Sequence, residues 1–168
     1  MKLILINGPC GIGKSTLSAK IHANAPLSFL LDIDAQRRYI SNYHEQKRES
    51  SAMIQDISCA IIKSCLENKH DVIVDKMIFD SDLLDQFYKI ANSCEAEVCE
   101  IIIWAPKDVV MKRAHERGFR ELGLLTPEKC ELFWDKIDEL KNIRPQAKVI
   151  DINNMTEEEV YSKISAVI

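Results

Sequence analysis

The chain has 168 residues, a length typical of one domain, and its 46% hydrophobic and 29% charged residues are the composition of an ordinary globular protein. Its 22 basic and 26 acidic residues give a net charge of −4, which disfavours a long nucleic acid as partner because such binders usually present a strongly basic surface. The first apolar run, residues 3–6, is too short to span a membrane or to act as a secretory signal, so we expect a cytoplasmic protein without a membrane partner.

Short apolar runs alternate with amphipathic segments along the chain. In the first half we predict a strand at 3–6, a helix at about 14–25, a strand at 28–33, a polar helix at 34–47, a helix at 51–66 and a strand at 72–74. In the second half we predict a helix at 83–91, a strand at 97–104, a helix at 106–117, a helix after Thr126, a strand at 149–152 and a helix after Thr156. Strands separated by helices form a parallel sheet with helices on both faces, so we predict one doubly wound, three-layer α/β domain over residues 1–168.

Residues 8–15, Gly-Pro-Cys-Gly-Ile-Gly-Lys-Ser, match the pattern G-x-x-x-x-G-K-[ST] of a phosphate-binding P-loop in full. In this motif the glycines let backbone N–H groups face phosphate oxygens, the lysine contacts the β- and γ-phosphates, and the serine hydroxyl binds Mg²⁺. The apolar run before the loop and the helical segment after it supply the context that the motif needs. We therefore predict a site for ATP and Mg²⁺. Its predicted nucleotide contacts are Gly8, Pro9, Cys10, Gly11, Ile12, Gly13, Lys14, Ser15 and Thr16.

Carboxylates follow two of the predicted strands. Asp32 and Asp34 end the second strand and Asp75 ends the third, and in open parallel sheets ligands lie beyond the carboxyl ends of the strands. We predict that one of the first two assists Mg²⁺ while the other accepts a proton from an acceptor hydroxyl, with both contacting the acceptor. Capping of the following helix, for which Asp34 is well placed, is the alternative role. Ser15, Asp32 and Asp75 are the predicted metal ligands.

Arginines gather late in the chain. Arg113 and Arg117 are four residues apart and share one helix face, and Arg120 follows in a polar segment. Guanidinium groups stabilise the charge that spreads over a phosphoryl group in transfer, so we predict a short lid at about residues 114–127 that closes over ATP. A solvated basic helix end is the alternative. Arg37 is a candidate for binding an anionic group of the acceptor, or is a surface residue. Arg120 is also predicted to contact the acceptor.

These features resemble the P-loop kinases related to nucleoside monophosphate kinases, most of all polynucleotide kinase, zeta-toxin-like and gluconate- or shikimate-kinase-like small kinases. The resemblance implies the sheet order 2-3-1-4-5 and a short arginine-bearing lid. It also implies Asp34 as general base and Arg37 as an acceptor clamp. It further implies that the loop Ile150-Asp151-Ile152-Asn153, with Asn153 as a contact, flanks adenine. Residues 75–77, Asp-Lys-Met, stand where shikimate kinases carry three glycines, which disfavours a shikimate acceptor.

We therefore expect an ATP-dependent kinase that phosphorylates a hydroxyl group of a small molecule, with Lys14, Asp34, Arg113 and Arg117 as catalytic residues. A nucleotide or polynucleotide 5′-kinase is a second hypothesis, and it requires a basic groove near Arg37, Arg38, Lys47 and Arg48. A nucleotide-binding regulatory protein without transfer activity is a third. The oligomeric state stays open.

The six cysteines include no C-x-x-C pair. A zinc site is therefore not predicted, and reduced thiols are expected. Cys10 lies inside the predicted phosphate loop, and we expect it to be an oxidation-sensitive residue without a function of its own.

Overall fold

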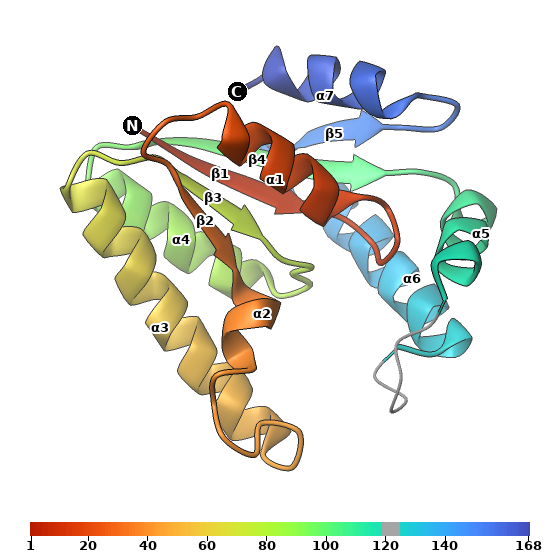
Figure 1. The fold of residues 1–168 in the computed structure, drawn as a ribbon, viewed down its shortest axis with the longest axis horizontal. Helices are drawn as coiled ribbons and strands as arrows, with labels where there is room; N and C mark the ends of the chain where they lie inside the picture. Colours follow the sequence, from red (N-terminus) through yellow and green to blue (C-terminus); the bar gives the residue numbers. More distant parts are fainter. Residues whose placement is uncertain (119–124) are drawn as a thin grey trace.

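The computed structural model describes residues 1–118 and 125–168, and its centre is a parallel five-stranded sheet (Figure 1). The strands are β1 (Lys2–Asn7), β2 (Phe29–Asp32), β3 (Val72–Asp75), β4 (Glu97–Trp104) and β5 (Lys148–Asp151). They are ordered β2-β3-β1-β4-β5, which confirms the order implied by the resemblance. In the register, Asp75 of β3 lies beside Asp32 of β2 and Ile6 of β1, so the carboxyl ends of these strands meet at one edge.

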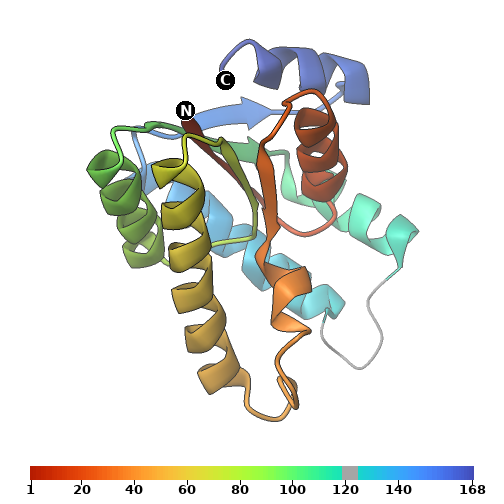
Figure 2. The ribbon, with the colours of Figure 1, turned by 60° about the vertical axis from the view of Figure 1, so that its left-hand side comes forward.

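Helices cover both faces of the sheet, as Figure 2 shows from the side. They are α1 (Lys14–Ala23), α2 (Ile33–Arg37), α3 (Lys47–Glu67), α4 (Ser81–Ser93), α5 (Lys107–Arg117), α6 (Pro127–Ile143) and α7 (Glu157–Ser165). Helices α3, α4 and α6 contribute to the apolar cluster on one face, whereas α1, α5 and α7 contribute to the cluster on the other.

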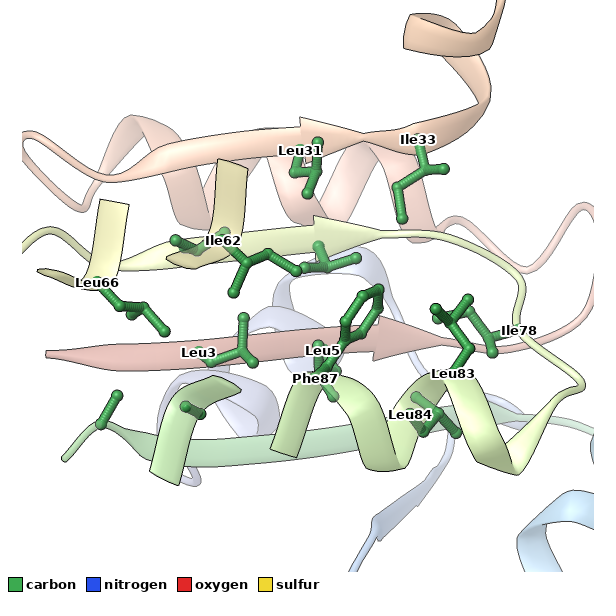
Figure 3. Packing of buried hydrophobic residues seen from close by; sticks show 14 of the residues in the cluster. Leu3, Leu5, Leu31, Ile33, Ile62, Leu66, Ile78, Leu83, Leu84 and Phe87 are labelled. Atoms are coloured by element: carbon green, nitrogen blue, oxygen red, sulfur yellow. The ribbon is translucent and has the colours of Figure 1, made fainter. Parts of the chain in front are cut away.

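The central strand β1 is buried on both faces because its apolar side chains point alternately to either side. Leu3 and Leu5 pack in the first cluster, where Figure 3 shows them beneath α3 and α4 and close to Phe87. Ile4 and Ile6 pack in the second cluster. An apolar β1 therefore anchors the loop that follows it between two rigid layers.

The prediction of a continuous helix at 34–47 is wrong. Helix α2 ends at Arg37, turns follow, and α3 begins at Lys47. The segment is polar and lacks the apolar spacing of a buried helix, and Asn42 takes a left-handed φ of 54° that breaks helical geometry. The described helices include none that is long and apolar enough to cross a membrane.

Candidate active site

The loop between β1 and α1 has the conformation that its glycines permit. Gly8, Gly11 and Gly13 all have positive φ, of 147°, 75° and 102°. A Cβ atom on Gly8 would lie 2.5 Å from the carbonyl oxygen of Ile103, and one on Gly11 would lie 3.2 Å from the backbone of Ala114 in α5. Larger residues would therefore both strain the loop and push it away from β4 and α5.

Asn7, the last residue of β1, ties this loop to the segment after β3. It is almost fully buried. Its Oδ1 atom accepts from the backbone N–H of Gly8 at 2.8 Å and of Ile78 at 3.0 Å, while Nδ2 donates to the Ile78 carbonyl at 2.8 Å. One side chain thus fixes the start of the P-loop against the β3–α4 connection.

Lys14 is the cation of the loop. Its Nζ atom donates to the carbonyl oxygens of Gly8 and Pro9, both at 2.9 Å, so the ammonium group curls over the loop itself. Burial lowers the pKa of Lys14 to about 8; the negative charge of Asp75 opposes the shift, and the positive charge of Arg117 adds to it. Arg117 of α5 is therefore within electrostatic reach of the loop, on the side where the lid was predicted.

Asp75 is the buried carboxylate of the site, and only 6% of it is exposed. Burial is the main cause of its raised pKa, the negative charges of Asp32 and Asp34 add to the shift, and a hydrogen bond from Ser15 and the charge of Lys14 oppose it. The ends of β2 and β3 thus bring three carboxylates together beside the loop.

The oxygen atoms at this point fit Mg²⁺. This ion prefers oxygen ligands and is usually held by one or two carboxylates together with water and substrate phosphates. Ser15 and Asp75 provide such a pair. Over the described ranges, no group of three or more His, Cys, Asp or Glu side chains forms a metal site by itself.

Asp32 and Asp34 have different local roles. Asp32, not Asp34, caps α2: its Oδ1 atom accepts from the N–H of Ala35 at 2.8 Å. The cap must be extended, as Asp32 is, whereas Asp34 already lies within the helix. Asp34 instead forms an ion pair with Lys76, and its half-exposed side chain is free of any capping role.

Arg37 uses its guanidinium group within the fold. Its Nε and Nη2 atoms donate to Ser50 Oγ at 3.1 and 2.9 Å, and Nη2 donates to the carbonyl of Lys47 at 2.7 Å. These bonds fold the 38–46 segment back onto the start of α3. A role as acceptor clamp would require breaking them. Residues 119–124 of the predicted lid lie outside the described residues. They include Arg120, which was also predicted to contact the acceptor.

A cavity of about 350 Å³ lies beside the loop on the side of α7. It is lined by Gly11, Ile12, Gly13, Thr16, Leu17, Lys20, Arg113, Ile152, Met155, Glu157, Val160 and Tyr161. Arg113 therefore lies next to the loop. Asn153 is not a lining residue; its backbone N–H donates to Asp151 Oδ1 at 2.8 Å, and its neighbour Ile152 faces the cavity.

Three residues of the candidate site were not predicted from the sequence. Asn7 had one signal, a polar residue at the end of an apolar strand directly before the first loop glycine. Lys76 follows Asp75 in sequence, but its pairing with Asp34 depends on the packing of β2 against β3. Tyr161 had no signal, because only the return of α7 over α1 brings it to the cavity.

The matches to known proteins cover most of the chain. A family model described as an AAA domain matches residues 3–128. An L-seryl-tRNA(Sec) kinase of Methanococcus maripaludis is 32% identical over 120 residues, which make up 69% of this chain and 46% of that protein. The chain thus spans about half the length of this curated relative.

Solved structures share the fold at low sequence identity. The tunicamycin resistance protein of Deinococcus radiodurans matches with a TM-score of 0.66 and 22% identity, covering 98% of this chain and 94% of that one. A gluconokinase from Sinorhizobium meliloti 1021 matches with a TM-score of 0.67 and 15% identity, covering 99% and 91%. At these identities the likeness establishes a common architecture.

Proposed function

We propose that this chain, which belongs to the AAA domain family, binds ATP with Mg²⁺ at its P-loop and is a kinase that transfers the γ-phosphoryl group to a hydroxyl group of a small molecule. Its 32% identity to a kinase over 120 residues supports the proposed reaction. The observation that carries the proposal is the buried carboxylate of Asp75 at the end of β3, within electrostatic reach of Lys14 of the loop, with the Asp34–Lys76 ion pair beside it. A site that only binds nucleotide does not need the half-exposed carboxylate of Asp34 in addition to that of Asp75.

Each residue has a distinct task in this proposal. The loop N–H groups and Lys14 hold the triphosphate, and the ammonium group exchanges its bonds to Gly8 and Pro9 for bonds to phosphate oxygens. Ser15 and Asp75 hold Mg²⁺, which when bound neutralises charge on the phosphates. Arg113 and Arg117 stabilise the charge of the transferring group from the side of α5.

Asp34 acts on the acceptor. Its carboxylate accepts the proton of the attacking hydroxyl group, and the ion pair with the ammonium group of Lys76 orients it. Asp32 is engaged as the cap of α2, which leaves Asp34 as the better candidate for the base. Because these groups lie at the carboxyl ends of β2 and β3, we place the acceptor between α2 and the loop.

A hydroxyl group of a small molecule or of a short side chain is the acceptor that the site favours. The curated relative is named for a seryl group, which is a primary alcohol. The clamp expected for an acceptor phosphate, Arg37, is engaged with Ser50 and Lys47, which argues against a nucleoside monophosphate. A 5′-kinase acting on a polynucleotide is further disfavoured by the net charge of −4.

The test is a comparison of acceptor classes with γ-labelled ATP and Mg²⁺. Free primary alcohols including serine, nucleosides, a 5′-hydroxyl oligonucleotide and a seryl-charged tRNA are assayed with the wild-type protein and with Asp34→Asn. We expect label in an ester of one class with the wild type, and a loss of at least about a hundredfold in rate with the variant. Equal rates for both proteins would remove Asp34 from the mechanism, and tight ATP binding without any transfer would favour a regulatory protein.

A further inference from the structure

Two cysteine side chains meet between the P-loop and α6. Cys10 of the loop and Cys130 of α6 are both buried, and together with Ala114 they form a small apolar cluster apart from the two main ones. Met111 and Leu125 pack against this cluster. The Cys10 side chain therefore points into the protein, while its backbone belongs to the phosphate-binding turn.

The other cysteines do not share this cluster. Cys94 is part of the cluster on the α3 and α4 face, and Cys59 and Cys65 pack against it. Cys99 belongs to the cluster on the opposite face of the sheet. Cys10 and Cys130 are thus the only two cysteines of the chain buried in one cluster, since none of the six lies within residues 119–124.

The surroundings give the two thiols different chemistry. Burial and a hydrogen bond with Cys10 raise the pKa of Cys130 to about 12, so its thiol stays protonated at neutral pH. Cys10 lies in the loop, within electrostatic reach of Lys14. Because 8% of Cys10 is exposed and none of Cys130, an oxidant reaches Cys10 first, and Cys130 is the partner that resolves the product.

We propose that Cys10 and Cys130 form a redox-modification site in which a peroxide converts the two thiols into a disulfide that ties the P-loop to α6. In the first step the Cys10 thiolate attacks one oxygen of hydrogen peroxide, the O–O bond breaks, and a sulfenic acid and hydroxide result. In the second step the sulfur of Cys130 attacks the sulfenic sulfur. The S–S bond forms, the S–O bond breaks, and the thiol proton leaves with the oxygen as water. Both sulfur atoms are oxidised and the peroxide is reduced.

The modification acts directly on nucleotide binding. The residue that is cross-linked lies between Gly8 and Gly11, both of which already pack tightly against β4 and α5. A covalent bond to α6 removes the remaining freedom of the loop to fit the phosphates, so the disulfide form binds nucleotide weakly. Bound nucleotide in turn holds the loop in place and slows formation of the disulfide, since the two effects are linked.

The experiment uses the whole chain with Cys59→Ser and Cys65→Ser, which removes the two more exposed thiols. It is treated with hydrogen peroxide, and intact mass, peptide mapping and MgADP binding are measured. We expect the loss of two hydrogen atoms, a cross-link between the peptides of Cys10 and Cys130, and an affinity for MgADP lowered by about tenfold or more. Dithiothreitol should restore both mass and affinity, and MgADP added first should slow the reaction.

Single replacements separate the two thiols. In the same background, Cys130→Ser should accumulate a sulfenic acid at Cys10 that dimedone traps, and Cys99→Ser should behave as the parent protein does. A cross-link that involves other cysteines, or none while Cys10 is overoxidised, would overturn the proposed pair. A Cys10–Cys130 disulfide that leaves MgADP affinity unchanged would overturn its effect on the loop. Because the readouts are mass and ADP binding, they do not depend on the proposed kinase reaction.

Discussion

Lys14 makes nucleotide binding depend on pH in a definite direction. Burial lowers its pKa to about 8, so the empty loop loses this positive charge as the pH rises through that value. Phosphate groups favour the charged form, and binding therefore takes up a proton above about pH 8. We predict that the affinity for ATP falls with rising pH, by up to about tenfold per pH unit above the pKa.

Calorimetry in buffers of different ionisation enthalpy measures both the affinity and the proton uptake. Lys14→Arg is the matched control, since a guanidinium group keeps its charge over this range. A pH dependence that is the same in both proteins would assign the effect to another group.

A substitution at Asp34 tests the chemical step without disturbing the stability of the fold. Its side chain is half exposed, caps no helix and pairs with Lys76. We predict that Asp34→Asn lowers kcat by about a hundredfold or more, while ATP affinity and the unfolding midpoint change little. Steady-state kinetics with the acceptor found above and urea unfolding measure these quantities. A variant with full activity would make Asp32 the candidate base.

The nucleotide side of the site was more predictable than the acceptor side, and the reason lies in sequence distance. Residues 8–16 are consecutive, so one motif predicts where they lie. Lys76 and Asp34 are 42 residues apart and meet only because β2 pairs with β3. The hydrogen bonds of Arg37 likewise depend on a turn that no local pattern indicates.

At the level of elements, the short helix α2 depends on its cap. Asp32 accepts a hydrogen bond from the N–H of Ala35, and it also adds negative charge beside Asp75. Asp32→Asn and Asp32→Ala remove the same charge, but only asparagine retains the cap. We predict that the alanine variant is less stable than the asparagine variant by about 1 kcal/mol.

Urea unfolding gives this difference directly. If Asp32 also supports the metal, both variants should need more Mg²⁺ than the wild type to reach half-maximal activity. Equal stability of the two variants would mean that α2 is held by its packing on α3 rather than by the cap.

The strands and long helices form where the spacing of apolar residues predicts them, because burial of those side chains determines both the sequence pattern and the element. The segment 97–104 ends in four successive apolar residues, at 101–104, and forms β4 over its whole length. The segment 34–47 has no such pattern, and its structure is decided by contacts such as those of Arg37 with Ser50. Composition alone could therefore not predict that α2 ends after five residues.

On the scale of the whole molecule, a buried ion network joins the central sheet to two helices, α4 and α6, that cover one of its faces. Arg144, just after α6, donates to Glu100 of β4 at 2.8 Å and also pairs with Asp85 of α4. Arg144 and Glu100 are 4% and 2% exposed. Arg144→Met would leave a buried carboxylate unpaired, and we predict a loss of about 3–5 kcal/mol in the free energy of unfolding.

Lys63→Met is the control, because it breaks an exposed pair with Glu67 on α3. It should change stability by less than about 0.5 kcal/mol. Denaturant unfolding followed by circular dichroism measures both. Similar small losses in the two variants would mean that water reaches Glu100 after the substitution.

The fold as a whole was predictable because strands and helices alternate and a P-loop follows the first strand. The sheet order came from the resemblance to small P-loop kinases, and the structure confirms it. The closeness of α7 to α1, which creates the cavity beside the loop, follows from the position of β5 at the sheet edge. Neither hydrophobic spacing nor charge in α7 indicated that contact.

The most direct test of the central claim is the fate of the γ-phosphoryl group of ATP. The whole chain is incubated with γ-labelled ATP, Mg²⁺ and a pooled set of small alcohols, and labelled products are separated and identified by mass spectrometry. The account predicts a phosphate ester with the wild type and none with Lys14→Met, in which the phosphates lose the cation of the loop. Label that stays in ATP or passes only to inorganic phosphate, although the wild type binds nucleotide, would contradict the account.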